Sequence, residues 1–425
     1  MRVIYLIGSY LLFALLTPIL LLHVKVRAGW RRRLGLYAEP ILPERPSAPG
    51  RPRIWLHGAS AGDLQAISPM IGELRSRLPD CTLIVSCLTN SGMLMGEQLA
   101  GVDAVTYLPW DLPGPTRRAM EAIAPDILVL EYTEVWPTLI RAARQAGAKV
   151  VLTNGRFSSR NLERYRFLFR LIGNPLREID LFLMREDDEA ERVLDLGAPL
   201  DRVWVTGNTK FDALVGRGAA PEGLAATLGL REDEPLLIAG STHEGEEGLL
   251  LEVYGRLRER FPALRLLVAP RYLERIARVE SLCREAGFEP RRRSDAGGDA
   301  AARVILLDTI GELGAAYALG TVVFVGGSFT DRGGQNILEP AACGRPVLFG
   351  PNMRNFHDAV QILQGRGGLQ VQDAAHLERV IAELLAQPET LREVGELARE
   401  TVAAIRGASV RNVDHMLRLL PGSRQ

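Results

Sequence analysis

The most constraining feature of this chain is a repeated alternation between short apolar runs and longer stretches with helical periodicity. The runs are rich in Val, Ile and Leu, and most of them end at a glycine or a polar residue. Continuous apolar runs of this length are typical of parallel strands that are covered on both faces. The pattern therefore predicts strand–helix–strand units and parallel sheets. The predicted strands are residues 54–57, 82–88, 104–108, 127–132, 149–154, 181–184, 203–206, 236–240, 265–269, 304–307, 321–325 and 347–349.

The alternation is interrupted once, which indicates two domains. The chain has 425 residues, enough for two full hydrophobic cores. We expect a linker at residues 216–230, between an N-terminal Rossmann-like domain at 34–215 and a C-terminal one at 231–425. Two doubly wound α/β domains would face a cleft at the carboxyl ends of their strands, where ligands bind in such sheets.

The N-terminal segment, residues 1–33, has the features of a membrane anchor. Residues 4–24 are almost uniformly apolar, and a run of this length can span a bilayer. One arginine precedes the run and five basic residues follow it by residue 33, which predicts that the folded domains stay cytoplasmic. The alternative is an interfacial helix whose basic residues lie on lipid headgroups.

The composition and the spacing of cysteine and histidine give no indication of a nucleic-acid partner or of a metal site. Lysine plus arginine and aspartate plus glutamate both number 51, so the chain has no basic bias toward nucleic acid. The four cysteines form neither a CxxC pair nor a metal-like spacing, which suits a reducing compartment. His243 lies near three glutamates but has no partner histidine at a helical ligand spacing. We therefore expect no metal and no cofactor.

A glycine-rich segment, residues 326–341, follows the predicted strand 321–325 and favours a nucleotide site. Its glycines allow sharp turns and close approach of the backbone to a ligand. A helix predicted to begin near Asn336 would direct free N–H groups toward a phosphate. Glu339 lies within that helix, where its carboxylate could bind two sugar hydroxyls. The alternative is an ordinary strand–loop–helix joint.

Polar residues follow three other predicted strands of the second half. Ser241 and Thr242, in the segment 240–247, suit a phosphate or sugar ligand. Arg271 is well placed for a nucleotide phosphate. The turn at residues 308–313 could contact a base or ribose through its backbone. Together these strand ends predict a binding site on the C-terminal domain.

The first half also has candidate residues at strand ends. Asp63 is either a general base for an acceptor hydroxyl or, with Ser60, part of a helix-capping box. Glu131 and Glu134 are predicted to position a substrate, and the alternative is a solvated turn before a helix that starts with proline. Arg156 and Lys210 could hold a phosphate or carboxylate, or could be ordinary surface residues.

These motifs, in this order, resemble the 3-deoxy-D-manno-octulosonic acid (Kdo) transferases, which add Kdo to the lipid A precursor of Gram-negative bacteria. The resemblance extends through nearly the whole chain, and the string Gly-Ser-Thr-His-Glu-Gly-Glu-Glu at residues 240–247 is highly specific. It implies a GT-B fold, an anchor in the cell inner membrane, and a metal-independent inverting transfer from CMP-Kdo to a lipid A precursor. The matching segments are residues 57–63, 107–113, 131–137, 206–212, 240–247, 310–313, 326–341 and 349–356.

The resemblance also assigns roles to individual residues. The family's catalytic base aligns with Asp63, where the family typically has glutamate. Two further departures are Tyr272-Leu273, where His-Pro is usual, and the segment 330–336, which lacks a histidine before the asparagine. The implied nucleotide contacts are Pro270, Arg271, Ile310, Gly311, Glu312, Asn336, Ile337, Leu338 and Glu339.

Because Asp63 departs from the family, two alternatives stay open. One is a divergent GT-B glycosyltransferase that uses another membrane acceptor or another sugar. The other is a non-catalytic, membrane-anchored binding protein with the same fold. A dinucleotide oxidoreductase is disfavoured, because no Gly-x-Gly-x-x-Gly follows the first strand of either half.

Overall fold

The structure, a computed structural model, describes residues 8, 10, 11, 13–15, 17, 18, 28–37, 41–42, 51–214, 222–231, 234–295 and 302–420. The chain divides into two compact units. Unit 1 comprises Met1–Ala213 and Arg406–Gln425, and unit 2 comprises Leu214–Ile405. The end of the chain thus belongs to unit 1, whereas we expected the C-terminal domain to extend to residue 425.

Unit 1 contains a seven-stranded sheet with the order β3-β2-β1-β4-β5-β6-β7. Strand β1 pairs in parallel with both β2 and β4, so the strand order reverses between β1 and β4. Ligands of open α/β sheets bind at the carboxyl ends of strands at such a reversal. The strands are β1 (Arg53–His57), β2 (Thr82–Cys87), β3 (Ala104–Tyr107), β4 (Ile127–Glu131), β5 (Lys149–Gly155), β6 (Leu181–Met184) and β7 (Val203–Val205).

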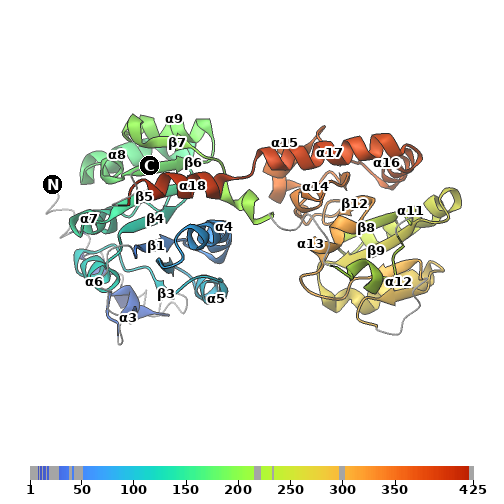
Figure 1. Cartoon of the computed structure of the whole chain (residues 1–425), viewed down its shortest axis with the longest axis horizontal. Coiled ribbons are helices and arrows are strands. Elements are labelled where there is room, and N and C mark those ends of the chain that lie inside the picture. The colour runs from blue at the N-terminus through green and yellow to red at the C-terminus, as the bar shows by residue number, and fades with distance from the viewer. Residues whose placement is uncertain are drawn as a thin grey trace. The chain divides into compact units, whose positions relative to one another are not determined.

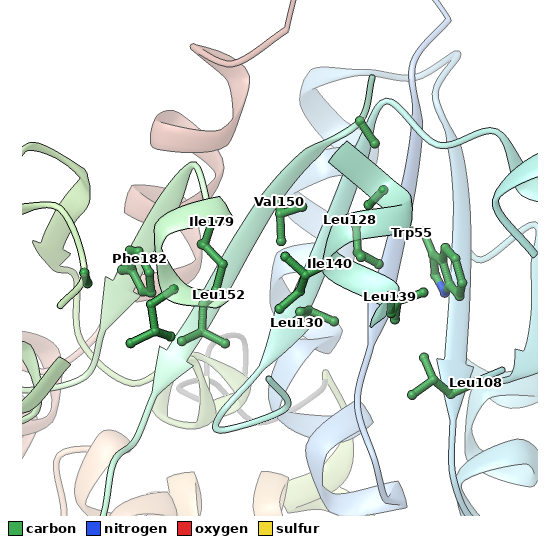
Figure 2. Packing of buried hydrophobic residues seen from close by; sticks show 14 of the residues in the cluster. Trp55, Leu108, Leu128, Leu130, Leu139, Ile140, Val150, Leu152, Ile179 and Phe182 are labelled. Atoms are coloured by element: carbon green, nitrogen blue, oxygen red, sulfur yellow. The ribbon is translucent and has the colours of Figure 1, made fainter. Parts of the chain in front are cut away.

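Helices cover both faces of this sheet (Figure 1). Side chains alternate between the faces along each strand. Trp55 and Leu128 thus pack with helices α6 to α9. Figure 2 shows Leu139 and Ile140, which belong to α7, in the same cluster. Ile54 packs on the other face with α4, α5 and α18. The helices are α3 (Trp30–Arg33), α4 (Ala61–Arg77), α5 (Asn90–Gln98), α6 (Pro113–Ile123), α7 (Pro137–Gln145), α8 (Leu162–Ile172), α9 (Asp187–Asp195) and α18 (Ala408–Leu417).

The return of the chain to unit 1 has a specific polar contact. Asp212, which is buried, accepts hydrogen bonds from the backbone N–H groups of Gly407 at 2.6 Å and Ser409 at 2.5 Å. These N–H groups belong to the first turn of α18, where a carboxylate also interacts favourably with the helix dipole. Val413 and Met416 then bury the other side of α18 in the core beside α4.

Unit 2 contains a second seven-stranded sheet, with the order β10-β11-β9-β8-β12-β13-β14, and its order reverses between β8 and β12. Its strands are β8 (Leu236–Thr242), β9 (Arg265–Pro270), β10 (Pro290–Arg292), β11 (Val304–Leu306), β12 (Val322–Val325), β13 (Val347–Phe349) and β14 (Gly368–Gln370). Its helices are α10 (Leu224–Thr227), α11 (Glu246–Arg260), α12 (Ile276–Glu285), α13 (Leu313–Ala316), α14 (Leu338–Ala342), α15 (His357–Leu363), α16 (Ala374–Ala386) and α17 (Pro388–Ala404).

The doubly wound α/β fold predicted from the sequence is confirmed, with differences at its edges. The predicted linker, residues 216–230, lies partly outside the described residues and otherwise contains the short helix α10. The predicted anchor, residues 4–24, lies mostly outside the described residues. Within the part of the chain that is described, no helix is both long and apolar enough to cross a membrane.

Candidate active site and nucleotide site

Asp63 lies in the first turn of α4, directly after β1, and its side chain completes a capping box. Its Oδ2 accepts hydrogen bonds from the N–H of Ser60 at 2.8 Å and from the Ser60 hydroxyl at 3.0 Å. The capping alternative is therefore correct for this oxygen. Among the described residues, Oδ1 has no hydrogen-bond partner, and the half-buried carboxylate keeps one oxygen available to a ligand.

Glu131 ends β4, the neighbour of β1, and lies in a buried polar network. It is fully buried. The Thr153 hydroxyl donates to Oε2 at 2.5 Å, and the Asn154 side-chain amide donates to Oε1. That amide also contacts the Thr209 hydroxyl, at 2.5 Å. Glu131 thus ties three strand-end segments of unit 1 together, and its position favours support of the site over direct contact with a substrate.

The pKa of Glu131 is raised to about 8, mainly by burial, and the nearby charge of Asp63 contributes in the same direction. The raised value means that the neutral carboxyl predominates at neutral pH in the folded protein. It also means that Asp63 is adjacent to a neutral group rather than to a second carboxylate.

This pKa predicts a pH-dependent effect of Glu131→Gln on stability. Because the folded pKa lies above the unfolded value, the stabilisation by Glu131 is complete in acid and is lost as pH rises through about 8. Glutamine retains a neutral polar group. We expect the stability of the variant relative to wild type to increase by up to a few kcal/mol between about pH 5 and pH 9. Its melting temperature should therefore rise relative to that of wild type over this range. Thermal unfolding across this range tests it, with the exposed Glu163→Gln as control; a difference independent of pH would contradict the raised pKa.

Glu134 connects the loop after β4 to the end of β1. Its Oε2 lies 3.4 Å from Nε2 of the buried His57 and accepts a hydrogen bond from the Trp136 indole at 2.8 Å. The other ring nitrogen of His57 lies 3.0 Å from the Ser86 hydroxyl. Glu134 is only half-buried, so one side of its carboxylate faces solvent near the strand ends.

Two predicted cationic contacts lie on the surface of unit 1. Arg156 follows β5, and its side chain is exposed. Lys210 lies in the 3-10 turn Thr209–Leu214 and is also exposed. Both positions are at the carboxyl edge of the sheet, where ligands of such sheets bind. Their contacts with a phosphate or carboxylate stay predictions.

In unit 2, the buried side chain of Glu246 fixes the loop that follows β12. Its two oxygens accept hydrogen bonds from the backbone N–H groups of Gly327 at 2.7 Å, Ser328 at 3.0 Å and Phe329 at 3.0 Å. The N–H of His243 is a fourth donor, at 2.9 Å. A Cβ on Gly326 would lie 2.6 Å from Cα of Thr242, so only glycine permits this approach.

The end of β8, opposite this loop, carries Ser241 and Thr242. Ser241 has a positive φ of 53°, which is uncommon for a residue other than glycine and is found at functional sites. Thr242 is buried and donates to Glu247 at 3.2 Å, so its hydroxyl already has a protein partner. Arg271 follows β9, with its backbone N–H bound to the Thr242 carbonyl at 2.9 Å and its side chain exposed.

The glycine-rich loop ends differently from the prediction. Helix α14 begins at Leu338, two residues after the expected start, and is only five residues long. Asn336 precedes it and accepts from the Leu338 N–H at 3.0 Å, while its amide donates to Glu339 at 3.3 Å. A helix this short has a weak dipole. It therefore gives less support to a phosphate site at its start than the sequence analysis predicted.

The turn after β11 presents an unusual apolar side chain. Ile310 is 87% exposed, although isoleucine is among the residues most often buried. Gly311 follows it with a positive φ of 87°. Glu312 accepts from Arg293 at 2.9 Å and from the Thr309 hydroxyl, and these contacts hold the turn. An exposed side chain on a braced turn suits contact with a planar ligand.

The comparisons with known proteins identify the family. A family model described as 3-deoxy-D-manno-octulosonic-acid transferase (kdotransferase) matches residues 28–213. The 3-deoxy-D-manno-octulosonic acid transferase of Bordetella pertussis is 33% identical over 385 residues, which cover 87% of this chain and 88% of the relative. The chain belongs to the 3-deoxy-D-manno-octulosonic acid transferase family. The enzyme of the same name from Haemophilus influenzae is 31% identical over 373 residues, 87% of each chain.

Family membership makes the chain a glycosyltransferase and confirms the resemblance inferred from its motifs. Among solved structures, a UDP-GlcNAc 2-epimerase from Neisseria meningitidis covers 86% of this chain and 100% of its own, with a TM-score of 0.59 and 15% identity. That likeness concerns the fold alone. The C-terminal CMP-Kdo binding domain of WaaA from Acinetobacter baumannii is 33% identical and covers 40% of this chain and 90% of its own, with a TM-score of 0.39.

Sequence reasoning missed two residues that organise the candidate sites of this transferase. Glu246 lies within the motif at residues 240–247. It fixes the loop after β12 through N–H groups about eighty residues later in the chain, which the local sequence does not indicate. Asn154 joins Glu131 to Thr209, and its positive φ of 49° coincides with a register shift between Thr153 and Gly155 of β5 against β6. The signal available for Asn154 was the Asn-Gly pair that ends its strand.

Proposed function

We propose that this glycosyltransferase moves Kdo from CMP-Kdo to a lipid A precursor at the cytoplasmic face of the inner membrane. The observation that carries the proposal is the carboxylate of Asp63 in the first turn of α4, with Oδ1 unpaired among the described residues, in a chain 33% identical to a Kdo transferase. In an inverting transfer the acceptor hydroxyl loses its proton as it attacks the anomeric carbon. Asp63 is the proposed base for this proton.

The donor is proposed to bind to unit 2, at the strand ends beside the sheet reversal. Arg271 would bind the phosphate and Glu339 the ribose hydroxyls, with Ser241 and Asn336 nearby in the same set of loops. Pro270, Ile310, Gly311, Glu312, Ile337 and Leu338 would complete the nucleotide contacts. Glu131 and Glu134 would organise the acceptor side on unit 1, and Arg156 and Lys210 would contact anionic groups of the substrates.

The donor assignment predicts a loss of CMP affinity in two variants. Hydrogen bonds to charged groups contribute about 1.5–3 kcal/mol each. Arg271→Ala and Glu339→Ala should therefore each weaken CMP binding by roughly ten- to a hundredfold in titration calorimetry. Arg278→Ala, on the exposed side of α12, is the control and should bind CMP as wild type does. Unchanged CMP affinity in both site variants would remove the assignment.

A second candidate is transfer to a different membrane acceptor. Asp63 favours it, because the family typically has glutamate here and aspartate is shorter by one methylene. A displacement of about 1 Å can cost on the order of a hundredfold in rate. A site reshaped around another acceptor would use the shorter side chain without this loss.

A further inference from the structure

His243, which follows β8 in unit 2, is the centre of a polar cluster that the proposed nucleotide contacts do not include. It is buried, with only 4% of its surface exposed. Its Nε2 lies 3.3 Å from the amide nitrogen of Gln335, and its ring meets that of Tyr272 edge to face, with 5.7 Å between the centroids. Tyr272 and Gln335 are also two of the positions at which the chain departs from the usual residues of the family. Both departures therefore adjoin the same buried histidine.

The loop after β12 brings Arg332 to this histidine. Gly327, in that loop, has a positive φ of 68°, and a Cβ on it would lie 3.1 Å from Cδ2 of His243 and 3.6 Å from Cβ of Arg332. The glycine thus lies against both residues. The Gly334 N–H donates to the Gly327 carbonyl at 2.8 Å and closes the loop. The contacts of Glu246 with the same loop hold this arrangement in place.

Arg332 and Arg271 are the unpaired charges of this part of unit 2. The neighbouring ions satisfy one another: Arg275 pairs with Glu247 at 3.1 Å, and Asp331 pairs with an arginine that follows β13. Within the described ranges, neither Arg332 nor Arg271 has a carboxylate at ion-pair distance. The strand ends thus offer two guanidinium groups, from two different loops, to an anionic ligand.

The surroundings of His243 keep its ring neutral and leave it one free donor. Burial lowers the pKa of His243, the charge of Arg332 lowers it further, and the charge of Glu247 opposes both. A neutral imidazole has one N–H. The amide nitrogen of Gln335 beside Nε2 places that proton on Nδ1. In the part of the chain that the structure describes, Nδ1 has no hydrogen-bond partner, so its N–H is available beside Arg332.

A ligand with two adjacent anionic groups matches this arrangement. CMP-Kdo carries its phosphate and its sugar carboxylate on one carbon atom, the anomeric carbon. One guanidinium is then available for each group, and arginine can bind a carboxylate through two parallel hydrogen bonds. CMP has only the phosphate and would leave one of the two arginines without a partner.

We propose that Arg332 and His243 bind the carboxylate of the donor sugar, beside the phosphate at Arg271. Gln335 positions the His243 ring for this contact. Because CMP-Kdo is itself the proposed donor, this subsite rests on the function proposed above. Its consequence is specificity, since unit 2 would select a nucleotide-linked sugar acid over a nucleotide linked to a neutral sugar.

Affinities of the full-length protein for CMP and for CMP-Kdo, measured without acceptor by titration calorimetry, test the subsite. Arg332→Gln should weaken CMP-Kdo binding by roughly ten- to a hundredfold and change CMP binding by less than about twofold. Arg366→Gln is the matched control, because Arg366 is exposed and precedes β14, at the opposite edge of the same parallel sheet. It should bind both ligands as wild type does. An equal loss of both ligands in Arg332→Gln would place this arginine on the phosphate and overturn the proposal.

An analogue of CMP-Kdo with a carboxamide in place of the carboxylate tests which group of the sugar is bound. It should bind to wild type about as weakly as CMP-Kdo binds to Arg332→Gln, and the substitution should then have little further effect. If Arg332→Gln weakened binding of the analogue as much as that of CMP-Kdo, Arg332 would bind another group of the sugar, which contradicts a carboxylate subsite.

The positioning role of Gln335 is tested by a loss and a rescue. Gln335→Leu removes the amide beside Nε2 and should weaken CMP-Kdo binding by about fivefold, with CMP binding unchanged. Gln335→His restores a hydrogen-bonding group and should recover most of the lost affinity. Equal affinities for CMP-Kdo in the leucine and histidine variants would contradict this role.

Failure of the subsite differs from failure of the proposed function. If wild type bound neither CMP nor CMP-Kdo, the proposed donor would be wrong and the subsite with it. If wild type bound CMP-Kdo and Arg332→Gln bound it equally tightly, the subsite alone would be wrong.

Discussion

Asp63→Asn is expected to lower the rate of sugar transfer by about a hundred- to ten-thousandfold, the usual effect of removing a general base. The protein should stay folded, because the asparagine side-chain oxygen can still accept the hydrogen bond from the Ser60 N–H that Oδ2 accepts now at 2.8 Å. Initial rates of CMP release, at saturating donor and acceptor, measure the effect. A wild-type rate in this variant would show that the base lies elsewhere, and Glu134 would be the next residue to change.

Ser60→Ala separates the two roles of Asp63. This change removes the hydroxyl partner of the capping box but leaves the carboxylate in place. It should cost about 1 kcal/mol of stability and change the rate far less than Asp63→Asn. Asp63→Glu separates the two candidate acceptors. Its activity should be retained or raised if the acceptor is the usual lipid A precursor, and lowered if the site has been reshaped for another acceptor.

Glu246→Ala is expected to disrupt unit 2 more than any other single change in the candidate nucleotide site. It would leave four N–H groups without an acceptor: the buried ones of His243, Gly327 and Ser328 and the partly buried one of Phe329. Each unsatisfied buried donor costs about 1–3 kcal/mol, so we expect a loss of at least about 3 kcal/mol and the loss of CMP binding. Faster hydrogen exchange at residues 327–329 would report the change directly.

Glu244→Ala is the matched control, two residues earlier in the same loop. The Glu244 side chain is 82% exposed and lies 3.5 Å from Arg275. Exposed ion pairs of this kind contribute about 0–1 kcal/mol. The control should therefore leave exchange at residues 327–329 and CMP affinity unchanged. Normal protection of these amides in Glu246→Ala would show that the loop after β12 is held by other contacts.

The buried strands could be predicted from the sequence because their apolar runs reflect cover on both faces. Residues 181–184 and 347–349 were predicted with the bounds that β6 and β13 have. The two strands that were missed, β10 and β14, lie at the edges of their sheet and contain arginine, glycine and glutamine in place of an apolar run. The place of α18 could not be predicted, because it depends on the contact of Asp212 with N–H groups almost two hundred residues later.

The candidate site could be predicted only where local sequence determines position. Glu131 lies at the end of a predicted strand and Asp63 and Arg271 come soon after one, so their location at the carboxyl edges of the sheets was foreseeable. The burial of Glu131 was not, because it results from contacts with Thr153 and Asn154 on a neighbouring strand. The clamp formed by Glu246 likewise depends on a pairing between two distant loops. The roles of these residues in binding and catalysis stay predictions.

The most direct measurement of the proposed activity is the fate of both substrates in one reaction. Full-length protein would be incubated with CMP-Kdo and detergent-dispersed lipid A precursor, with CMP release and the mass of the lipid followed together. We predict that the lipid gains the mass of at least one Kdo residue, with one CMP released for each sugar added, and that Asp63→Asn largely abolishes both changes. CMP release without any gain in lipid mass, or no reaction under conditions where CMP binds, would contradict the proposed transfer.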